Sequence, residues 1–192
     1  MVNLAGAGRT ADGVLRRVVA AEGGRDRAVF LGAMSVFVAL NIPMIRFERV
    51  MRSANDRGIV ALELAGSPTS ADVLLNGWGE AGRRAAHRSL CLDFLYLTSY
   101  TASQVCALRR VAAVRGPSRG GRWARTLVPV ALAAGGCDAV EGVALLTYLH
   151  GGAPAAPLVA RRAAQIKFAL LAVVLANLAS SPRELRRGLL PG

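Results

Sequence analysis

Four charged side chains stand inside apolar stretches of the sequence, and their types suit ion pairing, proton transfer or ligand binding. They are Asp93, Asp138, Glu141 and Lys167. At the centre of a bilayer a charged side chain costs about 2.5–3.5 kcal/mol even on the most lenient insertion scale. We therefore expect these four side chains to face the interior of a helix bundle, where they pair with one another or lose their charge.

Lys167 is the single lysine among 24 Lys and Arg residues. A lysine ammonium group is a compact point charge whose pKa shifts readily on burial, which suits a close ion pair or a titrating site. Asp138 and Glu141 are three residues apart, so on a helix they share a face. The sequence predicts that Lys167 lies within ion-pairing distance of one of these carboxylates.

Further polar side chains extend the predicted network. Asp93, Tyr96 and Tyr100 are spaced by three and four residues and therefore lie on one face of a helix. Asn41 lies at a similar depth in the first apolar stretch. We predict a network in the outer half of the bundle formed by Asp93, Asp138, Glu141, Lys167, Tyr96, Tyr100 and Asn41.

Two hypotheses about this network stay open. It is either a structural set of ion pairs and hydrogen bonds that fixes the helix register, or a binding or proton-handling site that opens to the outer side. In the second case the two carboxylates on one face would lie close enough to share a proton.

The sequence contains no signature of a catalytic or cofactor site. It has no phosphate-binding glycine loop, no nucleophile elbow and no zinc-binding helix motif. His87 and His150 are only weak candidates for a shared metal or haem, because no third ligand accompanies them. The three cysteines form no C-x-x-C pair and are expected to be small packing residues. We therefore predict no catalytic residue, no metal and no cofactor.

The elements that must position these residues are four long apolar stretches. A membrane-spanning helix needs roughly 17–25 predominantly apolar residues. We predict an all-α fold: a polytopic membrane protein built as a four-transmembrane-helix bundle with an outer interfacial helical hairpin. The predicted spans are residues 28–45, 86–108, 126–149 and 163–179.

The outer hairpin is expected within the longest connection, residues 46–85. Residues 58–78 divide into two short helical pieces around a Gly-Ser-Pro sequence at residues 66–68. These pieces are too short to cross a bilayer. Trp78 is expected at the level of the lipid headgroups, where its amphipathic ring is favoured.

Arginine placement predicts the orientation of the chain. Cytoplasmic segments of membrane proteins retain more Arg and Lys, and arginines concentrate here in residues 1–27, 109–125 and 181–192. We predict a multi-pass protein of the bacterial plasma (inner) membrane with cytoplasmic N- and C-termini. Its transmembrane domain is residues 28–180, between a basic N-terminal segment and a basic C-terminal tail.

The net charge of +12 also bears on partners. The basic residues lie in the connections between apolar stretches rather than on one soluble face, so we expect no nucleic acid partner. The expected partners are the lipid bilayer, anionic lipid headgroups at the Arg-rich inner loops, and a protein partner within the membrane.

Several short motifs resemble those of a group of small bacterial four-span membrane proteins of unknown function. The matching pieces are Leu62-Glu63-Leu64-Ala65, Trp78-Gly79, Asp93-Phe94-Leu95-Tyr96 with Tyr100, Asp138-Ala139-Val140-Glu141, and Lys167-Phe168. The resemblance implies that the intramembrane charges are shared features of the group. It also implies an amide after Glu141, where this chain has Gly142.

Three kinds of function are compatible with these features. The preferred hypothesis is an accessory or interaction subunit rather than an enzyme. The alternatives are a small transporter or ligand-binding membrane protein that uses the charged network, and a lipid-acting membrane enzyme with Glu63 and His87 on its outer side. A transporter needs a polar cavity that reaches the network, an enzyme needs a groove open to lipid, and an accessory protein needs neither.

Overall fold

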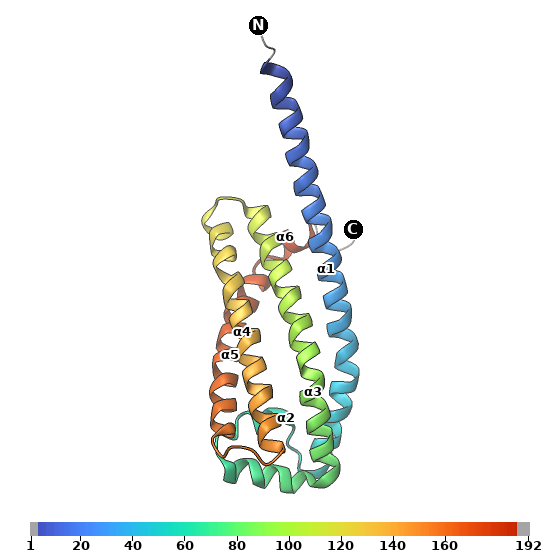
Figure 1. The fold of residues 1–192 in the computed structure, drawn as a ribbon, viewed down its shortest axis with the longest axis vertical. Coiled ribbons are helices and arrows are strands. Elements are labelled where there is room, and N and C mark those ends of the chain that lie inside the picture. The colour runs from blue at the N-terminus through green and yellow to red at the C-terminus, as the bar shows by residue number, and fades with distance from the viewer. Residues whose placement is uncertain (1–3, 188–192) are drawn as a thin grey trace.

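The protein is described by a computed structural model that covers residues 4–187, with side chains described from residue 24 on. Every regular element in this part of the chain is a helix, which confirms the all-α prediction. The elements are α1 (Leu4–Asn55), α2 (Ile59–Glu63), α3 (Pro68–Arg115), α4 (Arg119–Leu149), α5 (Ala156–Ala179) and α6 (Pro182–Arg186). Figure 1 shows the long helices running side by side.

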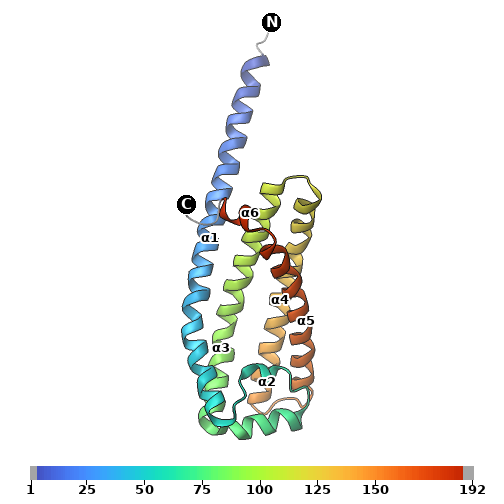
Figure 2. The same ribbon diagram turned by 180° about the vertical axis from the view of Figure 1, so that it is seen from behind.

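The four long helices form a bundle in which each packs on its neighbour in the chain. Helix α1 packs mainly on α3, α3 packs on α4, and α4 packs on α5. Helices α1 and α5 therefore flank the bundle, with α6 near one end and α2 near the other, as Figure 2 shows from behind.

Helix α1 is longer than the sequence prediction, which ended its first span at Ile45. It continues to Asn55 because the residues after Ile45 still favour a helix. Glu48 accepts a hydrogen bond from Arg52 at 2.7 Å, an i,i+4 pair that supports the added turns. Its other carboxylate oxygen accepts from the backbone N–H of Ile59 at 3.0 Å. The predicted outer loop is thus largely helical.

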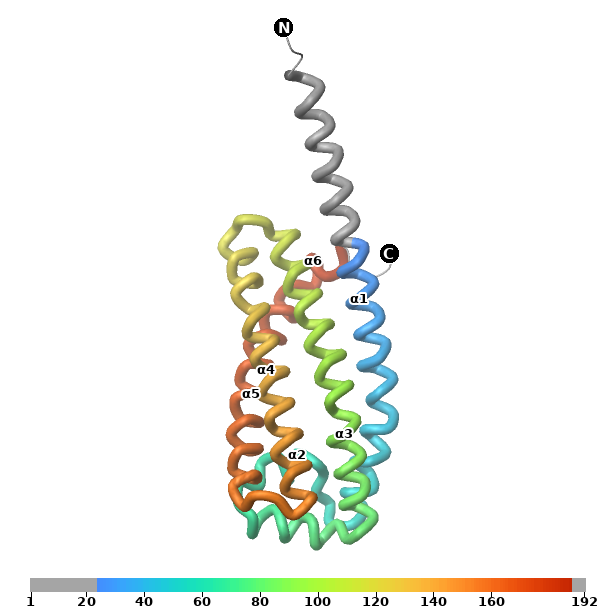
Figure 3. The backbone as a smooth tube through the Cα atoms, in the orientation of Figure 1, coloured from blue at the N-terminus to red at the C-terminus, as the bar shows by residue number. Residues whose placement is uncertain are grey.

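Helix α3 bends sharply at Gly79, whose φ of 61° and ψ of −165° break the helix into two arms. The short arm, residues 68–78, lies across the end of the bundle, and the long arm runs along it (Figures 1 and 3). Together α2 and the short arm supply the two helical pieces predicted for residues 58–78. Such a backbone conformation is open almost only to glycine, so Gly79 permits this corner.

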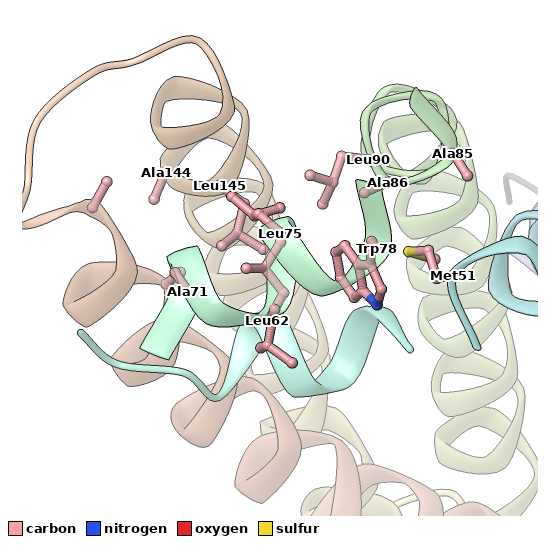
Figure 4. Packing of buried hydrophobic residues seen from close by; sticks show 13 residues of the cluster. Met51, Leu62, Ala71, Leu75, Trp78, Ala85, Ala86, Leu90, Ala144 and Leu145 are labelled. Atoms are coloured by element: carbon pink, nitrogen blue, oxygen red, sulfur yellow. The ribbon is translucent and has the colours of Figure 1, made fainter. Parts of the chain in front are cut away.

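The corner is closed by a hydrophobic cluster (Figure 4). Met51, Leu62, Leu75 and Leu145 are among its buried members and come from four different helices. Trp78 lies in the same cluster with 2% of its surface exposed, and its Nε1 donates a hydrogen bond to the Arg57 carbonyl at 2.7 Å. The prediction that Trp78 sits among lipid headgroups is therefore wrong, because its ring fills the corner instead.

The opposite end is closed by α6. Arg115, at the end of α3, donates a hydrogen bond to Glu184 at 2.8 Å. This contact holds the pKa of the Glu184 carboxyl below its usual range. The predicted basic tail thus begins as a short helix tied to α3.

Large apolar side chains are exposed on all four long helices. Two helical segments, Gly24–Asn55 and Arg119–Leu149, are long and apolar enough to cross a membrane. No other helix of the described chain meets that test. The exposed apolar residues include Val38, Ile42, Leu95, Leu132, Val143, Ile166 and Val173.

Candidate functional site

The buried charged residues meet around Lys167. Its Nζ lies 2.8 Å from Asp138 Oδ1 and 2.8 Å from Glu141 Oε2, so the predicted ion pair is present with both carboxylates. The exposed fractions of these three side chains are 8%, 7% and 3%. Ion pairs this deeply buried are favourable only when the geometry is close and the remaining oxygens find partners.

Two further residues complete this ion cluster. Tyr100 donates a hydrogen bond from its hydroxyl to Asp138 Oδ2 at 2.7 Å, so both oxygens of Asp138 are engaged. Glu63 reaches in from α2 and places Oε2 3.9 Å from Lys167 Nζ. We define the ion cluster as Glu63, Tyr100, Asp138, Glu141 and Lys167.

Glu63 was not among the predicted network residues. The sequence places it in the outer connection, where it served as a candidate for a lipid-acting enzyme. The structure instead turns α2 inward, because Leu62 is fully buried in the corner cluster and anchors this short helix. The signal that could have revealed Glu63 is its position as the only charged residue in the apolar run 58–71.

Small residues let the helices that bear the cluster come close together. Gly135 lies one turn from Asp138, and a Cβ at that position would lie 2.6 Å from Thr101 Oγ1 of α3. On α5, Ala160, Ala163 and Ala164 are buried near Lys167. Small side chains at helix contacts permit the close approach that short ion pairs need.

A cavity of about 490 Å³ opens onto the cluster from the side between α1 and α5. Its charged lining residues are Glu63, Asp93, Asp138 and Lys167. Asp93 lies at this cavity rather than inside the cluster, and it makes no ion pair or side-chain hydrogen bond with any residue in the described part of the chain. The prediction that Asp93 completes the ion-pair network is therefore wrong, since its carboxylate faces the cavity.

Aromatic side chains form much of the cavity wall. The Phe37 and Tyr96 ring centroids are 4.7 Å apart, and those of Tyr96 and Tyr100 are 6.1 Å apart in an edge arrangement. Tyr96 thus belongs to the wall and not to the ion cluster. Asn41 donates to the Phe37 backbone carbonyl at 2.7 Å, which uses its amide within its own helix and leaves it out of the cluster as well.

A second, apolar cavity of about 250 Å³ continues along the same side toward α6. The two cavities share Phe37, Tyr100, Gln104 and Leu175 in their linings. The side of the bundle between α1 and α5 therefore carries one long groove, charged near α2 and apolar near α6.

The two histidines come together where the C-terminal end of α4 meets α3. The ring centroids of His87 and His150 are 5.1 Å apart, and Cys91 Sγ lies 3.9 Å from the His87 ring nitrogens. Within residues 24–187 no three His, Cys, Asp or Glu side chains are arranged to hold a metal ion. Glu63 and His87, the residues considered for a lipid-acting enzyme, belong to separate clusters.

Comparison with known protein families, with curated proteins and with solved structures finds no match to this chain.

Proposed function

We propose that the protein is an integral membrane protein whose four long helices all cross the bilayer, in a bacterial plasma membrane with both termini in the cytoplasm. The support is the distribution of exposed charge. Within the predicted spans 28–45, 86–108, 126–149 and 163–179 the charged residues are buried or half-buried, apart from Arg88 near the start of the second, and exposed arginines stand close to the ends of the spans. These stretches have about the 17–25 residues that a crossing helix needs.

In this membrane setting, the protein binds a small ligand at the ion cluster. The ligand reaches the cluster through the groove between α1 and α5. The observation that supports this function best is the cavity of about 490 Å³ that reaches Asp93 and Lys167. Its size is within the usual range of ligand-binding cavities. An accessory subunit held together by a purely structural network would need no such opening.

The groove between α1 and α5 can be tested with dicyclohexylcarbodiimide, a lipid-soluble reagent that forms a stable N-acylurea on carboxyl groups within reach. In native membranes we expect it to modify Asp93, which faces the cavity. Asp138 and Glu141 should remain unmodified because Lys167 and Tyr100 engage them. Peptide mass spectrometry identifies the modified residue.

Two controls define the result. Asp93→Asn should abolish the modification, and a water-soluble carbodiimide should instead modify Glu80, an exposed carboxylate outside the groove. If Asp93 reacts only after the protein is unfolded, the cavity is closed in the membrane and the ligand-binding function fails.

A further inference from the structure

The charged side chains that line the cavity are carboxylates, apart from Lys167. The Lys167 ammonium group is already paired with Asp138 and Glu141, and the Tyr100 hydroxyl donates a hydrogen bond to Asp138. What remains toward the cavity is the carboxylate of Asp93 and the edge of Glu63, beside the uncharged Tyr96 hydroxyl and Gln104 amide. The cavity therefore has no positive charge that is free of a carboxylate partner among the described residues.

The charge balance points the same way. Glu63, Asp93, Asp138 and Glu141 supply four carboxyl groups, whereas Lys167 is the one basic residue among the described residues of the cluster and cavity. Uncompensated charge in a medium of low polarity is costly. A cationic ligand would compensate part of this excess.

Gln104 provides an independent sign of a missing donor. Only 9% of its surface is exposed, and its Oε1 has no hydrogen-bond partner among the described residues. The side chain lines both cavities of the groove. A buried carbonyl oxygen without a donor is costly, so a donor group that reaches this oxygen from the cavity would be bound favourably.

The positions of Asp93 and Gln104 define the length of the ligand. They are eleven residues apart on α3, which is close to three helical turns and about 16 Å along the axis. They therefore lie on the same face, with Tyr96 and Tyr100 between them. The aromatic rings of Phe37, Tyr96, Tyr100 and Phe168 line this interval, and aromatic faces attract organic cations.

We propose that the groove binds an elongated organic ammonium compound, with its ammonium group between Asp93 and Glu63 and a second N–H or O–H donor at Gln104. This inference rests on the ligand-binding function proposed above and names its ligand class. A bare metal ion is a poorer fit, because hard cations require about six or more oxygen ligands and this cavity has mostly aromatic and aliphatic walls.

Four straight-chain probes with eight carbon atoms each separate the features of this ligand. They are 1,8-diaminooctane, octylamine, 1-octanol and octanoate, measured by titration calorimetry with the full chain in phosphatidylcholine nanodiscs, and with empty nanodiscs as the reference. Both amines should bind at least about tenfold more tightly than the alcohol and the acid, as expected when a charged hydrogen bond is gained. The diamine should bind more tightly than octylamine.

Two variants assign the ends of the ligand. Asp93→Asn should weaken both amines about tenfold or more, whereas Gln104→Leu should weaken the diamine about fivefold and leave octylamine unchanged. The matched control Glu80→Gln alters an exposed carboxylate outside the groove and should change neither value. Circular dichroism and gel filtration verify that each variant is folded.

Equal binding of all four probes would overturn the proposal, as would amine binding that is insensitive to Asp93→Asn. If no probe binds although dicyclohexylcarbodiimide modifies Asp93, the groove is open but the proposal of an ammonium ligand is wrong. If neither is observed, the ligand-binding function itself fails.

Discussion

Lys167 is the residue on which the buried carboxylates depend. Its ammonium group lies 2.8 Å from each of Asp138 and Glu141 and 3.9 Å from Glu63. Removing one partner of a buried ion pair is strongly destabilising because the remaining charge is left without compensation. Here one substitution would leave three carboxylates together.

Lys167→Met should therefore lower the free energy of unfolding by about 3–5 kcal/mol. Adding Glu141→Gln should recover part of the loss, because one uncompensated charge is removed. Equilibrium unfolding in mixed micelles measures both effects. Arg162→Met, an exposed change on the same helix, is the control, and a Lys167→Met protein as stable as the wild type would contradict a tight ion cluster.

The two tyrosines of α3 allow a matched comparison. Tyr100 donates a hydrogen bond to the Asp138 carboxylate, while Tyr96 contributes its ring to the cavity wall. Hydrogen bonds to charged groups contribute about 1.5–3 kcal/mol, so Tyr100→Phe should destabilise the protein by that amount. Tyr96→Phe should cost clearly less in the same unfolding assay. Equal effects would show that the Tyr100 hydroxyl does not hold Asp138.

Part of this site could be predicted from residue types and spacing. Lys167 is a lone lysine in an apolar stretch, and two carboxylates lie at the same depth on one face of another helix. Such a lysine has few favourable arrangements, so its ion pair with these carboxylates could be predicted. The inward turn of Glu63 could not be predicted, because it depends on how Leu62 anchors α2. The location of Asp93 at a cavity depends on how far α1 stands from α5, which no local pattern encodes.

At the scale of elements, the corner of α3 is the feature that shapes the end of the bundle where α2 lies. Sequence patterns predicted two short helical pieces here, but not that the second would continue into the long helix through Gly79. A single glycine within a helical pattern usually indicates only a position where the helix is less stable. The folded structure shows the role of Gly79. The bend at this residue lets the Trp78 ring pack into the corner cluster and donate a hydrogen bond to the Arg57 carbonyl.

Gly79→Ala should destabilise the protein by about 1–3 kcal/mol, because alanine is strained at this backbone conformation. Apart from the adjoining backbone, no atom lies within 4 Å of the position where its Cβ would stand, so the cost is one of conformation and not of crowding. Gly136 in α4 is the matched control, since it is equally uncrowded but helical, and Gly136→Ala should be neutral or stabilising. If both changes have the same effect on thermal unfolding, the claim that Gly79 holds a backbone conformation strained for other residues is wrong.

At the scale of the whole molecule, the two ends and the middle differ in composition. Exposed arginines gather at the ends, large apolar side chains are exposed between them, and the charges of the middle are turned inward. Length and hydropathy alone identify α1 and α4 as helices able to cross a membrane. On α3 and α5, half-buried Asp93 and buried Lys167 both point toward the cavity between the helices, and a test of single helices cannot detect this.

The proposal that all four long helices cross the membrane is most directly tested by labelling introduced cysteines with a membrane-impermeant maleimide in intact cells. Ser70 and Ser118 are exposed and lie near opposite ends of the bundle. With the native cysteines Cys91, Cys106 and Cys137 replaced by alanine, Ser70→Cys should be labelled from outside, and Ser118→Cys only after the cells are permeabilised. Labelling of both positions from the same side, or of neither before permeabilisation, would contradict the four-span arrangement and the membrane groove that depends on it.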